Sequence, residues 1–127
     1  MKKMVIYLAA SLLTFTIGVT CAMSPRVITV YRAQALRSRE AVLRAELFQM
    51  HKAIGQYAAE KGTPPRSLIQ IVEAGYMHDI PVDPITELKD WDEEVIDLRG
   101  QFDILILRDV HSLSQAISSE GTPYNEW

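Results

Sequence analysis

The segment Asp109-Val-His111-Ser112 brings together an acid, a base and a hydroxyl group. These are the residue types of a Ser-His-Asp hydrolase, in which the base lies between the nucleophile and the acid. The side chains of residues this close in the sequence cannot normally place the base between the nucleophile and the acid. The segment therefore does not predict a hydrolase.

The two other histidines give no better catalytic site. His51 has no acid or nucleophile at a useful spacing and is expected at the surface of a helix. His78 precedes Asp79 in a proline-rich segment, where a local hydrogen bond is the simplest interpretation. The sequence also lacks a glycine-rich phosphate loop, the Cys/His spacing of a zinc site and the calcium loop of a helix-loop-helix motif. The sequence predicts that the protein is not an enzyme.

The last 19 residues are rich in side-chain oxygen atoms that could bind calcium. Calcium takes about 6–8 oxygen ligands and tolerates irregular loops. By composition alone, however, such a segment is more typical of a solvated turn. The side chains that carry these oxygen atoms are Asp109, Ser112, Ser114, Ser118, Ser119, Glu120, Asn125 and Glu126.

A long helix is expected over residues 26–61. Its apolar residues recur at helical spacing, and the Gly62 and Pro64-Pro65 that follow predict its end. The part from 43 to 57 should pack on the protein's own domain, whereas 26–39 carries too few large apolar side chains and should be exposed. The apolar stripe consists of Leu36, Leu43, Leu47, Met50, Ile54 and Tyr57.

A short second helix is predicted over residues 67–75. Ser67 is suited to the N-cap of this helix, and Gly75 is suited to its C-terminal stop. Pro81 and Pro84 then exclude regular structure and favour an ordered, extended loop.

Two strands are predicted after the loop, over residues 94–98 and 102–107, with a turn near 99–100. The unbroken apolar run at 104–107 suggests that the second strand is buried on both faces. Residues 109–127 are then expected to form a loop-rich tail.

The beginning of the chain predicts a membrane or export segment. Residues 4–25 carry no charge, and their apolar part, 4–23, has 20 residues, close to the roughly 20 that a helix needs to cross a bilayer. A retained membrane helix fits this length. A cleaved secretory signal would have a shorter apolar run and small residues at the cut, which Thr20 and Ala22 could supply. Lipid attachment to Cys21 is a third alternative, although the preceding Gly-Val-Thr matches its usual sequence poorly.

Removal of residues 1–25 would leave 102 residues, enough for one small domain. Cys21 is the only cysteine, so this domain has no internal disulfide. Residues 26–66 hold eight basic and three acidic side chains, whereas 67–127 hold three basic and 13 acidic ones. A basic segment beside a membrane can attract anionic headgroups, and the acidic remainder is unsuited to binding nucleic acid.

Several short motifs follow one another along residues 25–127. They are a Tyr-x-x-x-x-Gly-x-x-Pro turn, a Ser-Leu-x-x-x-Val-x-x-Gly-Tyr helix, an Ile-Pro-x-Asp-Pro loop and a tail with Asp-Val-His-Ser and Gly-Thr-Pro-Tyr-x-x-Trp. In content and order they resemble the pseudopilins of bacterial type II secretion, in particular the major pseudopilin. The matching residues are Tyr57, Gly62, Pro65, Ser67, Leu68, Val72, Gly75, Tyr76, Ile80, Pro81, Asp83, Pro84, Asp109, Ser112, Gly121 and Trp127.

The resemblance implies an α+β, pilin-like fold in the bacterial inner membrane. It assigns a cytoplasmic leader to residues 1–3, a single transmembrane helix to 4–24, a periplasmic helix to 25–62 and a small head to 63–127. The head would contain a second short helix and a small antiparallel sheet, and it would lie in the periplasm.

Pseudopilins stack their N-terminal helices into a short periplasmic filament, the pseudopilus. With other pseudopilins, a secretion ATPase, a platform protein and an outer-membrane secretin, this filament exports folded proteins. The resemblance therefore implies a structural subunit of a type II secretion system. The alternative is a soluble periplasmic binding or interaction domain released from a cleaved signal peptide.

The N-terminus departs from the family at two positions. Lys3 stands where pseudopilins have the Gly of the prepilin peptidase site, and Leu8 stands where they have a Glu. That Glu is a buried carboxylate that pairs with a neighbour's N-terminal amine during assembly, and a carboxylate in lipid is costly and usually functional. Its replacement by Leu8 predicts weak self-assembly.

The resemblance also implies a place for calcium. Major pseudopilins bind it in the C-terminal loop, through a carbonyl after the Ser of Asp-x-x-Ser and acidic side chains around a Glu-Gly-Thr turn. Here no acid precedes the turn, and each lost carboxylate lowers calcium affinity. The remaining ligands would be the Leu113 carbonyl, Ser114 and Glu120, in a site that is weak or empty. Burial of Tyr124 and Trp127 is expected to hold the tail instead.

Overall fold

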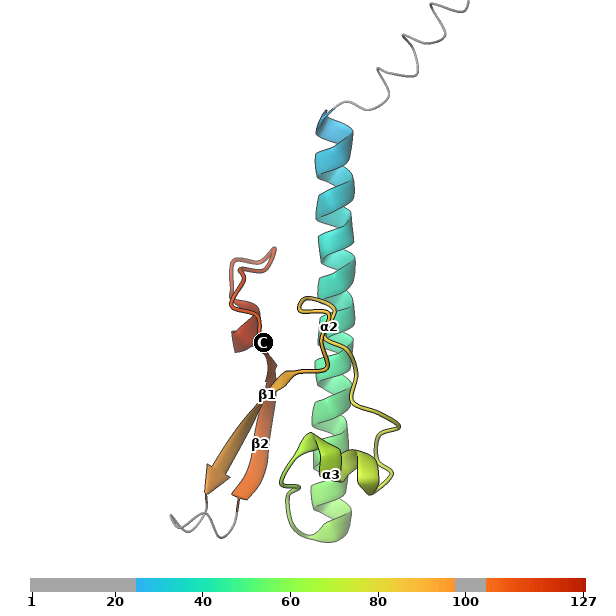
Figure 1. Ribbon diagram of the computed structural model, residues 1–127, viewed down its shortest axis with the longest axis vertical. Helices are drawn as coiled ribbons and strands as arrows, with labels where there is room; N and C mark the ends of the chain where they lie inside the picture. Colours follow the sequence, from blue (N-terminus) through green and yellow to red (C-terminus); the bar gives the residue numbers. More distant parts are fainter. Residues whose placement is uncertain (1–24, 98–104) are drawn as a thin grey trace, which may run out of the picture. The chain divides into compact units, whose positions relative to one another are not determined.

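The computed structural model describes residues 25–97 and 105–127. It has α2 (Pro25–Lys61), α3 (Leu68–Glu73), β1 (Trp91–Asp97), β2 (Leu105–Ser112) and the 3-10 helix η1 (Tyr124–Glu126), in this order (Figure 1). The predicted α+β class is confirmed: one long helix accompanies a two-stranded antiparallel sheet, an arrangement compatible with a pilin-like fold.

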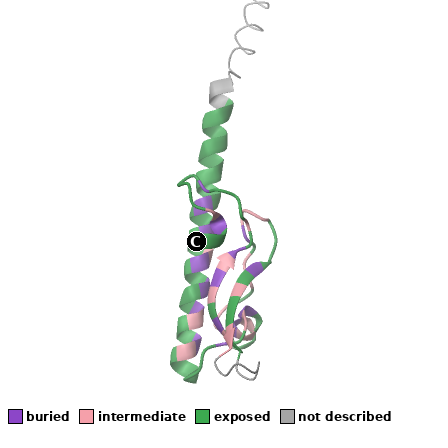
Figure 2. Ribbon diagram, turned by 90° about the vertical axis from the view of Figure 1, so that its left-hand side faces the viewer, coloured by how far each residue is buried: buried purple, intermediate pink, exposed green. Residues whose placement is uncertain are grey.

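Helix α2 changes character along its length. Every residue from 28 to 39 is exposed, as the sequence predicted, and burial begins at Glu40. Figure 2 shows this change along the helix, from turns that are green throughout to turns that also carry purple. Beyond that residue the spacing of the buried side chains keeps them on one face of the helix. Leu36, predicted to belong to this face, is 38% exposed. The buried apolar residues of α2 are Leu43, Leu47, Met50, Ala53 and Tyr57.

The described residues between Leu36 and Trp127 form one compact unit, whose core collects side chains from both helices, both strands and η1. Tyr76, Met77, Ile80 and Ile85 of the loop between α3 and β1 pack against its margin. The buried members of the core are Leu43, Leu47, Met50, Ala53, Leu68, Ile71, Trp91, Leu107, Val110 and Tyr124.

Local signals set both ends of α3, as the sequence predicted. Ser67 is the N-cap, and its Oγ accepts a hydrogen bond from Gln70 N at 3.3 Å. At the other end Gly75 has a φ of 82°, which glycine adopts without strain. Tyr76 N donates to the Ile71 carbonyl at 3.1 Å, which closes the turn in a Schellman-type cap.

The strands differ from their predicted bounds. β1 begins at Trp91 rather than residue 94, and β2 continues to Ser112 rather than 107, so the predicted tail is wrong for its first four residues. Burial of β2 on both faces is also wrong, because Ile106, on the face opposite to Leu107, is partly exposed, whereas Leu107 is 1% exposed. A two-stranded sheet with one face on the core leaves the other face in solvent. The predicted turn at 99–100 lies outside the described residues.

A β-bulge shifts the register within the sheet. Glu94 pairs with Asp109, but the next residue, Val95, pairs with Leu107, so Arg108 is the extra residue on β2. The bulge allows Leu107 and Val110 to face the core although they are three residues apart. It also places Glu94 directly opposite Asp109.

Among the residues that the structure describes, no helix combines the length and the apolar character needed to cross a bilayer. The expected transmembrane segment, residues 4–24, lies outside the described residues.

Candidate functional site: the C-terminal clasp

The C-terminal loop is fastened to α2 by a buried carboxylate that the sequence did not single out. Glu40 is 2% exposed. Its Oε1 accepts hydrogen bonds from Ser119 N at 2.6 Å and from Tyr124 Oη at 2.9 Å, and its Oε2 accepts one from Ser119 Oγ. A single helix residue thus holds both the loop and η1.

The surroundings of Glu40 keep its carboxyl group ionised at neutral pH. Burial raises the pKa of Glu40, but hydrogen bonds from Ser119 and Tyr124 and the charge of Arg44 outweigh it, so the pKa lies below its usual value. Burial and the hydrogen bond to Glu40 raise the pKa of Tyr124 to about 12. The carboxylate is therefore ionised and the phenol protonated, as this hydrogen bond requires.

A second attachment lies one helical turn further along α2. The Arg44 guanidinium pairs with Glu120 at 2.5 Å and lies over the Trp127 ring, 4.2 Å from its centroid. Trp127 also donates from Nε1 to Thr122 Oγ1 at 2.9 Å and meets Tyr124 edge to face at 5.2 Å. We refer to the whole set as the C-terminal clasp. It comprises Glu40, Arg44, Ser119, Glu120, Tyr124 and Trp127.

The expected anchoring of the tail is confirmed for Tyr124, which is 1% exposed. Trp127 is only partly buried: it packs against the margin of the core, and Arg44 lies over its ring. The aromatic pattern in the sequence was sufficient to find these two residues, but not their partners on α2.

Two of the three expected calcium ligands, Ser114 and Glu120, have other partners here. Ser114 Oγ accepts a hydrogen bond from Ala116 N at 3.3 Å, and the Glu120 carboxylate is paired with Arg44. Leu113 lies in the loop after β2 and is 50% exposed. A calcium ion bound by Glu120 would have to compete with the Arg44 guanidinium, and the calcium site stays a prediction. The assembly residues Lys3 and Leu8 lie outside the described residues.

The hydroxyl group of the Asp-Val-His-Ser segment has a structural partner. Ser112 is fully buried, and its Oγ donates to Asp83 Oδ2 at 2.5 Å. Asp83 is also fully buried, and its Oδ1 accepts from Ile85 N at 2.7 Å. Ser112 thereby ties the end of β2 to the proline-rich loop, and it is bonded to Asp83 rather than to His111.

His51 is exposed, as the sequence predicted, but the fold gives it an acidic partner that its sequence neighbours do not supply. His51 Nε2 lies 2.7 Å from Asp109 Oδ1, and His111 Nε2 lies 3.8 Å from Asp109 Oδ2. Burial raises the pKa of Asp109, but the Val110 N–H and the two imidazoles outweigh it, so the pKa lies below its usual value. The α2 histidine and the β2 acid are far apart in sequence, so no spacing rule could pair them.

The described residues thus present two polar groups, the C-terminal clasp and the cluster of His51, Asp109 and His111. Comparison with models of protein families, with curated proteins and with solved structures finds no match for this chain.

Proposed function

We propose that the protein is a structural, pseudopilin-like subunit of a type II secretion system. The observation that carries the proposal is the run of exposed residues 28–39 in α2, a helix whose later turns are buried in a small α+β unit. A surface helix of a self-contained domain typically carries an apolar stripe that faces the core. A continuous helix with an exposed part is what a subunit needs if it packs against the helices of its neighbours.

The exposed part of α2 carries apolar side chains suited to such packing. Ile28 is 41% exposed, Val30 64% and Tyr31 71%. Apolar surface of this kind is stabilised when neighbouring helices cover it. The order of motifs along residues 25–127, which resembles that of pseudopilins, points to the same assembly.

In this proposal residues 4–24 span the bacterial inner membrane once, 25–62 form the periplasmic helix and 63–127 belong to the periplasmic head. The partners are other pseudopilins, a secretion platform protein and the inner membrane. The subunit enters a periplasmic pseudopilus that helps to export folded proteins. In this role the subunit acts by packing against its neighbours and does not catalyse a reaction.

Intact mass of the protein isolated from its native membrane tests the anchor. We expect a chain that retains Leu8 and Cys21. Loss of the residues up to Ala22 would contradict the proposal and favour a soluble periplasmic binding domain released from a signal peptide.

Cysteine crosslinking tests the assembly. In a Cys21→Ser background, Tyr31→Cys places a thiol on the exposed apolar part of α2, and Gln49→Cys places one at an exposed position beside the buried face. In cells that contain the secretion machinery, we expect crosslinked dimers and larger species from Tyr31→Cys that exceed those from Gln49→Cys. Equal crosslinking at both positions would contradict packing through the first turns of α2.

A further inference from the structure

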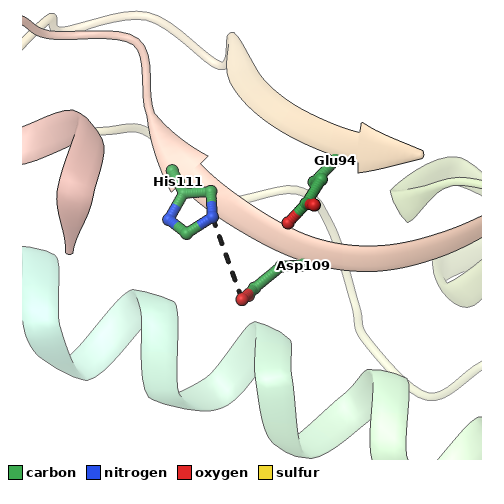
Figure 3. A group of neighbouring side chains, drawn as sticks. All are labelled: Glu94, Asp109 and His111. Carbon is green, nitrogen blue, oxygen red and sulfur yellow. Dashed lines mark ion pairs between the residues drawn. The ribbon is translucent and has the colours of Figure 1, made fainter. Parts of the chain in front are cut away.

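Three metal-ligating side chains meet on the sheet. Asp109 and His111 are two residues apart on β2 and point to the same side, and the bulge sets Glu94 of β1 directly opposite Asp109. One ligand atom from each of the three lies within 4.8 Å of the others (Figure 3). All three remain partly exposed, so an ion could reach them from solvent.

The imidazole of His111 is oriented as it is in known metal sites. Its Nδ1 lies 2.7 Å from the backbone oxygen of Trp127. A neutral ring that donates from Nδ1 to this oxygen presents the lone pair of Nε2 toward Asp109. Backbone carbonyls commonly fix metal-binding histidines in this way.

The Asp109 carboxylate has its two oxygen atoms in different roles. Oδ1 accepts a hydrogen bond from Val110 N at 2.9 Å and faces His51 Nε2 at 2.7 Å. Oδ2 faces His111 Nε2 at 3.8 Å. An ion bound at Oδ2 would therefore leave the hydrogen bonds of Oδ1 in place, and His51 would hold the carboxylate in position.

The spacing is close to what a small cation needs. Zinc bonds of about 2.0–2.2 Å place tetrahedral ligand atoms roughly 3.4 Å apart, slightly nearer than the 3.8 Å between His111 Nε2 and Asp109 Oδ2. Rotation of exposed side chains can close this gap. Glu94 is paired with Arg108 at 3.2 Å, but the Arg108 side chain is 64% exposed and that of Glu94 44%, and a solvent-exposed pair of this kind is weak.

We propose that Glu94, Asp109 and His111 bind one divalent transition-metal ion of the zinc type, with water as a further ligand and His51 as a positioning residue. An imidazole combined with two carboxylates suits zinc better than calcium or magnesium, which prefer oxygen ligands alone. The bound ion would join β1 to β2 and, through His111 and the Trp127 carbonyl, to the C-terminal clasp. This inference does not depend on the proposed role in secretion.

The simpler interpretation is that these side chains form only the two surface pairs, His51 with Asp109 and Arg108 with Glu94. Zinc titration of the full-length protein in detergent separates the two. We expect one Zn²⁺ per chain, a rise in Tm, and a visible absorption band when Co²⁺ is used as the probe. Excess Ca²⁺ should not displace either ion. Absence of saturable Zn²⁺ binding in the parent would overturn the proposal.

Variants assign the ligands. Glu94→Gln and His111→Gln should each weaken Zn²⁺ binding at least tenfold, whereas His78→Gln, which changes an exposed histidine in a loop, should not. His51→Ala should weaken it about tenfold, as is usual for a partner of a metal ligand, and His51→Gln, which keeps a donor, should restore part of the loss. Equal effects of His78→Gln and His111→Gln would overturn the assignment.

Nuclear magnetic resonance of the histidine rings tests the site in the parent protein, so the result does not depend on a variant that could misfold. Zn²⁺ should shift the Nε2 signal of His111 and leave its Nδ1 protonated. A shift confined to His78 would contradict the site.

Discussion

Removal of the Glu40 carboxylate should release the C-terminal loop from α2. In Glu40→Ala, Ser119 and Tyr124 lose the acceptor for three hydrogen bonds. A buried donor left without a partner costs about 1–3 kcal/mol, so we expect a loss of about 3–5 kcal/mol in the free energy of unfolding. Glu40→Gln should cost less, about 1–2 kcal/mol, because its amide oxygen can still accept while its amide nitrogen faces other donors.

Urea unfolding of the full-length protein in detergent, followed by tryptophan fluorescence, measures this loss. Trp91 lies in the core and Trp127 in the clasp, so the two report different parts of the molecule. Glu46→Gln is the matched control, since Glu46 is on the same helix but only partly buried. It should change stability by less than about 0.5 kcal/mol. Hydrogen exchange at the Ser119 amide should accelerate in both Glu40 variants.

The effect should depend on pH with a defined sign. Because the pKa of Glu40 is lower in the folded chain than in the unfolded chain, the unfolded chain binds more protons in acid. The stabilisation by Glu40 is therefore complete above about pH 4.3, the usual glutamate value, and is lost as the pH falls through the lowered pKa. The difference in stability between the parent and Glu40→Gln should shrink accordingly. Two results would contradict the conclusion that Glu40 is ionised in the clasp. One is a Glu40→Gln variant as stable as Glu46→Gln, and the other is a stability difference between the parent and Glu40→Gln that is the same at pH 7 and in acid.

Three further predictions concern the buried loop contact, calcium and assembly. Asp83→Ala should cost about 2–4 kcal/mol, because a buried acceptor of several hydrogen bonds is lost, whereas Ser112→Ala should cost about 1 kcal/mol; urea unfolding measures both. Calcium should raise Tm by less than a few degrees relative to chelator, and a larger rise that disappears in Glu120→Ala would show an intact calcium site. Leu8→Glu combined with Lys3→Gly should increase crosslinking between subunits, and strong crosslinking in the parent that the double variant leaves unchanged would contradict the argument from the missing carboxylate.

The sequence was sufficient where structure depends on neighbouring residues. The end of α2 follows from Gly62, which has a φ of 72° and donates from its N–H to the Ala58 carbonyl at 3.0 Å. Both caps of α3 likewise lie within a few residues of the helix. Such signals can be read directly because the groups that satisfy each other are close in the chain.

The sequence was insufficient where partners are distant. A glutamate within a charged helix is normally exposed, and nothing near Glu40 indicates that Ser119 and Tyr124 will cover it. The bulge at Arg108 interrupts the alternation of buried and exposed residues, so the end of β2 was placed too early. The pairing of His51 with Asp109 was missed for the same reason.

The residues that carry the resemblance to pseudopilins have structural partners in the folded head. Asp83 and Ser112, from separate motifs, are hydrogen-bonded to each other in the core. Pro65 is buried, and its carbonyl accepts from Leu107 N at 2.7 Å, which joins the turn after α2 to β2. These motifs therefore specify how the head is built, and a change in any of them should first appear as a loss of stability. In the proposed subunit the departures at Lys3 and Leu8 are of a different kind, because the resemblance assigns these positions to processing and to contacts with a neighbour. A chain with this head can fold normally and still assemble weakly, so stability and crosslinking must be measured separately.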